Sequence, residues 1–97
     1  MKSISGVGTA ISSNWTATVE HQNNTIFVEN SLSIELGQLQ NMGSISFIKT
    51  FDGGSVTFIC AGKTIIYPFD SQFNGKDGST AVVTIYGNKC YIRINNV

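Results

Sequence analysis

Hydrophobic and polar residues alternate near the end of the chain, and this alternation predicts a β-hairpin. Residues 81–86 and 89–94 flank Gly87-Asn88, a pair that suits a tight two-residue turn. Successive side chains of a strand point to opposite faces, so a hairpin that pairs Ala81 with Ile94 has two unlike faces. One face is wholly apolar: Ala81, Val83, Ile85, Cys90, Ile92 and Ile94. The other is amphipathic and aromatic: Val82, Thr84, Tyr86, Lys89, Tyr91 and Arg93.

Similar short runs upstream predict further strands. They lie at 15–20, 25–29, 31–36, 44–52, 55–61 and 64–67. Gly, Asn, Ser and Asp separate these runs, and no window shows the apolar period of about 3.6 residues that indicates a helix. Two of the runs, 44–52 and 55–61, predict a second hairpin about Gly53-Gly54, with Phe51 opposite Val56.

Regularly spaced short strands are typical of an all-β sandwich or barrel. We therefore expect one domain over residues 1–97, folded as an antiparallel β-sandwich, jelly-roll-like, with about eight or nine short strands. Residues 1–13 are small and polar, and we expect them to form either a flexible lead-in or an edge strand.

The amino-acid composition argues against two classes of binding partner, nucleic acids and anionic membranes. The chain has six Lys and Arg residues and six Asp and Glu residues, and therefore no net charge. A neutral surface offers no electrostatic footprint for nucleic acid or for an anionic membrane. The first residues lack the apolar run of a signal peptide, and no stretch approaches the roughly 18 apolar residues of a membrane helix. These features predict a chain made in a cytoplasm, with no nucleic-acid or membrane partner.

Catalytic and metal-binding groups are sparse. The lone histidine, His21, stands beside Glu20, and a small hydrolase built on this pair is one alternative; our expectation is no catalytic residue and no cofactor. Asp70, Asn74 and Asp77 are a weak candidate for a calcium loop. Ala81 occupies the position of the closing Glu of such a loop, so a polar loop held by Asx-turns and glycines is favoured. The two cysteines, Cys60 and Cys90, are predicted to be buried free thiols.

Aromatic residues could form either a sugar-stacking platform or ordinary packing and subunit contacts. Those considered are Trp15, Phe27, Phe51, Tyr67, Phe69, Phe73, Tyr86 and Tyr91. Tyr86 and Tyr91 share with Arg93 the hairpin face that points away from the core, and a monomer would leave this face exposed. Trp15, Tyr86, Tyr91 and Arg93 are therefore the candidate ligand or subunit-interface residues.

The second half of the chain resembles β-structured modules of bacteriophage fibre and tail-tip proteins. The resemblance lies in 43–48, 54–58, 75–81, Tyr86-Gly87 and 91–94, a succession of glycine turns and Ile/Val strands. It implies a non-enzymatic virion structural protein, commonly a homotrimer, that decorates a capsid or tail alongside other virion proteins or binds a host-surface glycan. It carries no fixed set of functional residues. A carbohydrate-binding module or lectin is the alternative.

Overall fold

The computed structural model describes residues 9–97, and their regular structure is β apart from one 3-10 turn. Nine strands are present in this part of the chain: β1 (Thr9–Ile11), β2 (Trp15–Thr16), β3 (Thr25–Val28), β4 (Leu32–Glu35), β5 (Ser44–Lys49), β6 (Val56–Ile59), β7 (Thr64–Ile66), β8 (Thr80–Tyr86) and β9 (Lys89–Asn95). The 3-10 turn is η1 (Val19–His21). The all-β expectation and the strand number are confirmed.

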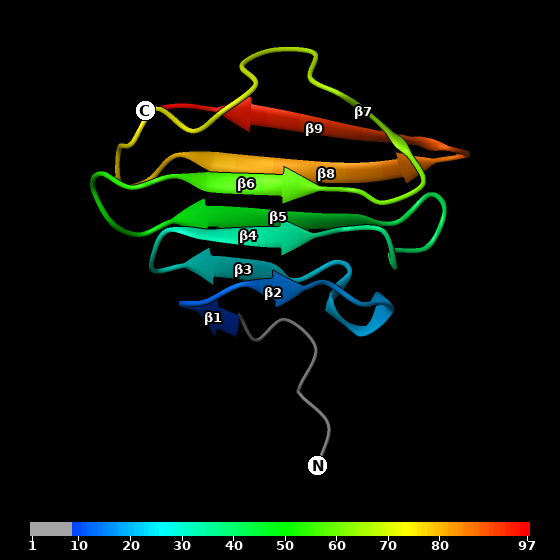
Figure 1. Cartoon of the computed structure of the whole chain (residues 1–97), viewed down its shortest axis with the longest axis horizontal. Coiled ribbons are helices and arrows are strands. Elements are labelled where there is room, and N and C mark those ends of the chain that lie inside the picture. Colours follow the sequence, from blue (N-terminus) through cyan, green and yellow to red (C-terminus); the bar gives the residue numbers. More distant parts are fainter. Residues whose placement is uncertain (1–8) are drawn as a thin grey trace.

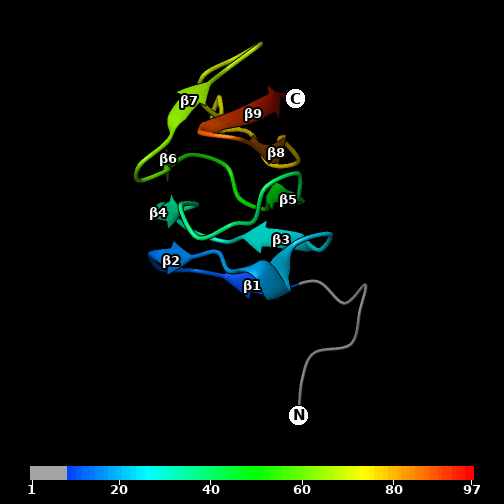
Figure 2. The ribbon, with the colours of Figure 1, turned by 90° about the vertical axis from the view of Figure 1, so that its right-hand side faces the viewer.

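The strands form two sheets that face each other. One sheet has six strands in the order β1-β3-β5-β8-β9-β7, and the other has three in the order β2-β4-β6. Figure 2 looks nearly along the strands and shows the two sheets as separate layers. Strands β1, β3 and β5 are parallel to one another, as are β2, β4 and β6. The chain winds as a β-solenoid of about four turns (Figure 1).

The predicted antiparallel, jelly-roll-like sandwich is therefore wrong. After each of the first strands the chain crosses to the opposite sheet instead of turning back beside itself. Strands that follow one another in sequence consequently lie in different layers, and like-directed strands from successive turns become neighbours.

The predicted hairpin about Gly53-Gly54 is also wrong. β5 pairs with β3 and β8, whereas β6 pairs with β4 in the other sheet. Both glycines have positive φ, 80° and 76°, a backbone region that glycine enters at little cost. Here the positive φ values let the chain turn from the six-stranded sheet into the three-stranded sheet. The run predicted at 15–20 is a strand only over Trp15–Thr16 and then enters η1.

The closing hairpin has the predicted register. β8 and β9 are antiparallel, with Tyr86 opposite Lys89 at the turn and Ala81 opposite Ile94 at the far end. Gly87 has a φ of 63°, which explains why glycine suits this turn. The hairpin adds to the edge of β5, where β8 runs antiparallel to it, and thereby ends the parallel stack.

The core lies between the two sheets. The six-stranded sheet contributes the apolar face of the closing hairpin together with Ile26, Val28, Ile45 and Phe47, all buried. The three-stranded sheet contributes Leu32, Ile34, Val56 and Phe58. At the centre, the ring centroids of Phe47 and Phe58 are 5.4 Å apart and meet edge-on, a favoured aromatic geometry.

A buried lysine holds the corner between β5 and β6. Lys49 is fully buried, and its Nζ donates hydrogen bonds to the carbonyl oxygens of Phe51 and Gly53, both at 2.6 Å. The same Nζ lies 3.3 Å from the centroid of the Phe51 ring, a cation–π contact. Burial lowers the pKa of Lys49, while the carboxylates of Asp52 and Asp77 oppose this shift.

Replacing Lys49 with Met should destabilise the protein although it keeps the length and apolar stem of the side chain. The carbonyl groups of Phe51 and Gly53 would lose their donor at this part-buried corner, which costs about 1–3 kcal/mol of unfolding free energy. Urea unfolding of Lys49→Met would measure this cost. Lys76→Met is the control, because Lys76 is exposed in the loop before β8; equal losses in the two variants would contradict the role of Lys49.

Candidate functional site

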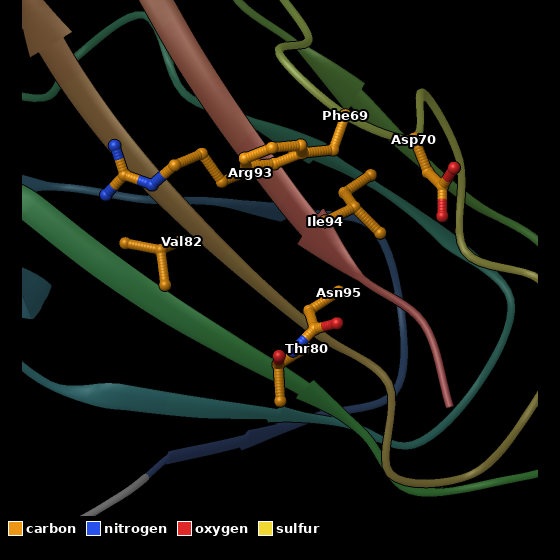
Figure 3. Close-up of a pocket in the computed structure, with 7 residues that line it drawn as sticks. All are labelled: Phe69, Asp70, Thr80, Val82, Arg93, Ile94 and Asn95. Atoms are coloured by element: carbon orange, nitrogen blue, oxygen red, sulfur yellow. The ribbon is translucent and has the colours of Figure 1, made fainter.

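A groove lies on the outer face of the six-stranded sheet, at its C-terminal end. It has a volume of about 560 Å³, within the size range of small-molecule sites. Its lining residues come from β8, β9 and the loop before β8: Phe69, Asp70, Thr80, Val82, Arg93, Ile94 and Asn95. In Figure 3 the ring of Phe69 lies across β9, and Arg93 extends toward β8.

The loop from 67 to 79 is fixed against the end of β9. An isolated antiparallel bridge joins Asp70 to Ile94. The side-chain amide of Asn96 donates to the Oδ2 atom of Asp70 at 2.8 Å and to the carbonyl of Gln72 at 3.1 Å. The Asn96 Oδ1 atom accepts from the backbone N–H of Asn74 at 2.9 Å. One side chain therefore ties three points of the loop, and the groove wall that carries Phe69 is held in place.

The weak calcium candidates have other hydrogen-bond partners. The Oδ1 atom of Asn74 accepts from the backbone N–H of Lys76 at 3.1 Å and from the Ser79 hydroxyl at 3.2 Å. The first of these bonds is an Asx-turn, as predicted for this loop. The backbone N–H of Asp77 donates to Asp52, and the carboxylate of Asp70 accepts from Asn96. Within residues 9–97, no cluster of three or more His, Cys, Asp or Glu side chains could hold a metal ion.

Of the candidate interface residues, Arg93 lies in the groove, and the two tyrosines lie beside it on the same face. Tyr86 is 62% exposed at the hairpin turn. Tyr91 is half-buried between Thr84 of β8 and Ile66 of β7. Neither tyrosine lines the groove.

Trp15 instead packs inward. Its ring centroid lies 6.4 Å from that of Phe47, and 4.7 Å from that of His21. His21 accepts a hydrogen bond at Nδ1 from the backbone N–H of Thr18, at 3.1 Å, and thereby caps η1. Trp15 and His21 thus stabilise the turn between β2 and β3, and the structure does not bring either of them to the groove.

The two cysteines are buried free thiols, as predicted. Burial is the main cause that raises the pKa of Cys90, to about 12, and the adjacent Cys60 adds to this effect. Burial also raises the pKa of Cys60, although a hydrogen bond with Cys90 and the nearby Lys63 oppose it. Burial raises the pKa of Tyr67 as well. These thiols resist ionisation and suit the core better than nucleophilic chemistry.

Part of the lining of this groove was predictable from the sequence. The alternation of β8 and β9 placed Val82 and Arg93 on one outward face. The position of Phe69 does not follow from alternation, because it depends on the long-range bridge between Asp70 and Ile94. In the sequence, Pro68 marks the place where the strand ends, because proline cannot donate a backbone hydrogen bond to a sheet. Phe69 follows directly and therefore belongs to the loop.

Comparison with known proteins adds no assignment. No protein-family model matches the chain, and neither a curated protein nor a solved structure shows significant similarity to it. Among the described residues, no helix is long and apolar enough to cross a membrane.

The burial of Cys90 predicts a loss of stability at alkaline pH. Its thiol has an ordinary pKa of 9.0 when unfolded and about 12 when folded, so the folded state holds more protons between these values. The stabilisation is complete below about pH 9 and is lost as the pH rises through this window.

Urea midpoints measured with a reductant present, from about pH 8 to pH 11, would test this expectation. The wild-type midpoint should fall more steeply than that of Cys90→Ala, with each compared with its own value at the lowest pH. Lys49 is present in both proteins, whereas the substitution also removes the contact of Cys90 with Cys60, so the difference reports on Cys90 together with this contact. Parallel curves would contradict the raised pKa.

Proposed function

We propose that the chain is a non-enzymatic structural module of a bacteriophage virion that self-associates through the outer face of its six-stranded sheet. The observation that carries this proposal is an apolar strip on that face. Its members come from three neighbouring strands, β1, β3 and β5: Ala10, Phe27 and Ile48. No element within residues 9–97 covers the strip (Figure 2).

The strip is one row that crosses three strands and ends at Thr80 of β8. Ala10 pairs with Phe27, Phe27 with Ile48, and Ile48 with Thr80, so their side chains lie in one row. Phe27 remains 36% exposed. The neighbouring hydroxyls of Ser44 and Thr84 bond to each other at 3.0 Å, which lessens their need for water. Neighbouring apolar side chains on the outside of a sheet favour that face as an interaction surface.

The opposite face of the molecule, formed by the three-stranded sheet, has a different polarity. Outward residues of the three-stranded sheet are mostly polar: Thr16, Ser33, Glu35, Thr57 and Ile59. Ile59 is the one apolar residue among these, whereas the six-stranded sheet carries the row Ala10, Phe27 and Ile48. This difference favours the six-stranded sheet as the one that is buried in an assembly.

A second copy of the chain is a suitable occupant. The protein extends 35 × 32 Å along its two longer axes, which correspond to the plane of the sheets in Figure 1. A face of this extent is larger than the roughly 800 Å² that each partner buries in a standard interface. The chain has no net charge, so copies would not repel one another strongly.

The virion setting rests on the resemblance of residues 43–94 to phage fibre and tail-tip modules. That resemblance favours a homotrimer that contacts other virion proteins. A virion location also fits a chain without net charge.

Carbohydrate binding is a second candidate function. The specific observation that favours it is the groove beneath Phe69, whose ring is 71% exposed. An exposed aromatic ring beside polar side chains is suited to stack on a sugar. Such binding is compatible with a virion component that attaches to a host-surface glycan.

Ile48→Glu should dissociate the assembly without unfolding the chain. Ile48 lies on the central strand β5 and points outward, so a carboxylate there would be buried unpaired in the interface but solvated in the monomer. Light scattering coupled to gel filtration should give a multiple of 10.5 kDa for the wild type, with a trimer favoured, and 10.5 kDa for the variant.

Thr57→Glu is the matched control, because Thr57 is exposed on the outer face of the three-stranded sheet. It should retain the wild-type mass, and circular dichroism should show all three proteins folded. A monomeric wild type at high concentration, or dissociation by Thr57→Glu alone, would contradict the proposed interface.

A further inference from the structure

We propose that the groove under Phe69 binds a sugar that carries a carboxylate group, with Arg93 recognising the carboxylate and Phe69 stacking on the sugar ring. This inference rests on the second candidate function, carbohydrate binding, and specifies the class of sugar.

Arg93 supplies a cation without an intramolecular counter-ion. Its guanidinium makes no hydrogen bond or ion pair with any side chain or backbone group of residues 9–97, and it is exposed on the outer face of β9. The carboxylate in the lining, that of Asp70, accepts a hydrogen bond from Asn96 and points away from Arg93 (Figure 3). The part of the groove beside Arg93 therefore suits an anion. A guanidinium binds a planar carboxylate through two parallel hydrogen bonds.

Phe69 supplies an apolar ring on a fixed backbone. The adjacent Asp70 is held to β9 by its bridge with Ile94 and by the Asn96 amide. A ring that is 71% exposed gains little from the core, although its backbone is fixed. Such a preformed surface binds without a large ordering cost, and the C–H face of a pyranose ring is a suitable partner.

The remaining lining residues suit a ligand that has both hydroxyl groups and an apolar face. Thr80 and Asn95 face each other across β8 and β9 and present a hydroxyl and an amide. Val82, opposite Arg93, forms an apolar floor. The volume of about 560 Å³ falls in the usual range of ligand sites, roughly 300–1,000 Å³.

Titration of the ¹⁵N-labelled wild-type assembly with four sugars tests the proposal. Trigalacturonic acid and sialyllactose carry carboxylates, and maltotriose and lactose are their neutral counterparts. We expect at least one acidic sugar to shift the amide signals of Phe69, Thr80 and Arg93, and to bind at least about tenfold more tightly than its neutral counterpart. Added salt should weaken this binding, because the Arg93 site is exposed to screening.

Three variants test which residue contacts which part of the sugar. Arg93→Gln should reduce the preference for the acidic sugar by about tenfold. Phe69→Ala should weaken the binding of acidic and neutral sugars by the same factor, because it removes the stacking contact and leaves the charge of Arg93 in place. Lys89→Gln is the matched control: Lys89 is an exposed cation on the same strand and face, outside the groove. It should leave affinity and preference unchanged.

The outcomes separate this inference from the function on which it rests. Equal binding of acidic and neutral sugars in the groove would overturn carboxylate recognition and leave carbohydrate binding standing. Binding of none of the four would overturn both. A loss of preference in Lys89→Gln as large as in Arg93→Gln would show nonspecific charge attraction and overturn the role of Arg93. A change in assembly mass in Phe69→Ala would assign the groove to a subunit contact and overturn the ligand site.

Discussion

The two edges of β5 determine how the rest of the molecule is arranged. On one edge, β5 continues the parallel stack that begins with β1 and β3; on the other, it pairs antiparallel with β8. Phe47 on this strand fills the centre of the core, and Lys49 fixes the corner that follows. A parallel stack would otherwise end in an unpaired strand edge, which invites pairing with other chains. The closing hairpin covers that edge.

The same arrangement creates the surface from which function is proposed. Because β8 and β9 extend the sheet of β3 and β5, the outward residues of four strands lie on one face. Ile48 of the apolar strip and Val82 of the groove thereby lie on one face. At the far end, Asn96 ties the loop before β8 to the end of β9, and this tie gives the face a groove instead of a flat edge. Assembly and ligand binding would thus use neighbouring parts of a single sheet.

Local features of the fold could be predicted from the sequence, whereas the stacking of its turns could not. The β8–β9 register follows from Gly87-Asn88 and the alternation on either side, which are close in sequence. Parallel neighbours are far apart in sequence and unequally spaced: the step from Thr9 to Ile26 is shorter than that from Ile26 to Phe47. This unequal spacing leaves no regular repeat of fixed length between the parallel strands. Gly53-Gly54 suits a hairpin or a corner equally, and the buried Lys49 ammonium favours the corner. In the groove, Arg93 was predictable from alternation, but Phe69 required the bridge between Asp70 and Ile94.

The most direct test of this account is a map of backbone contacts to β5 by nuclear Overhauser spectroscopy. The structure predicts contacts between Phe47 and both Ile26 and Ala81, the partners in β3 and β8. A simple hairpin would instead place the backbone of Phe51 beside that of Val56 and the backbone of Phe47 beside that of Cys60. Contacts from β5 to both β3 and β8 would support the solenoid and the surface built on it. Backbone contacts between β5 and β6 would contradict both.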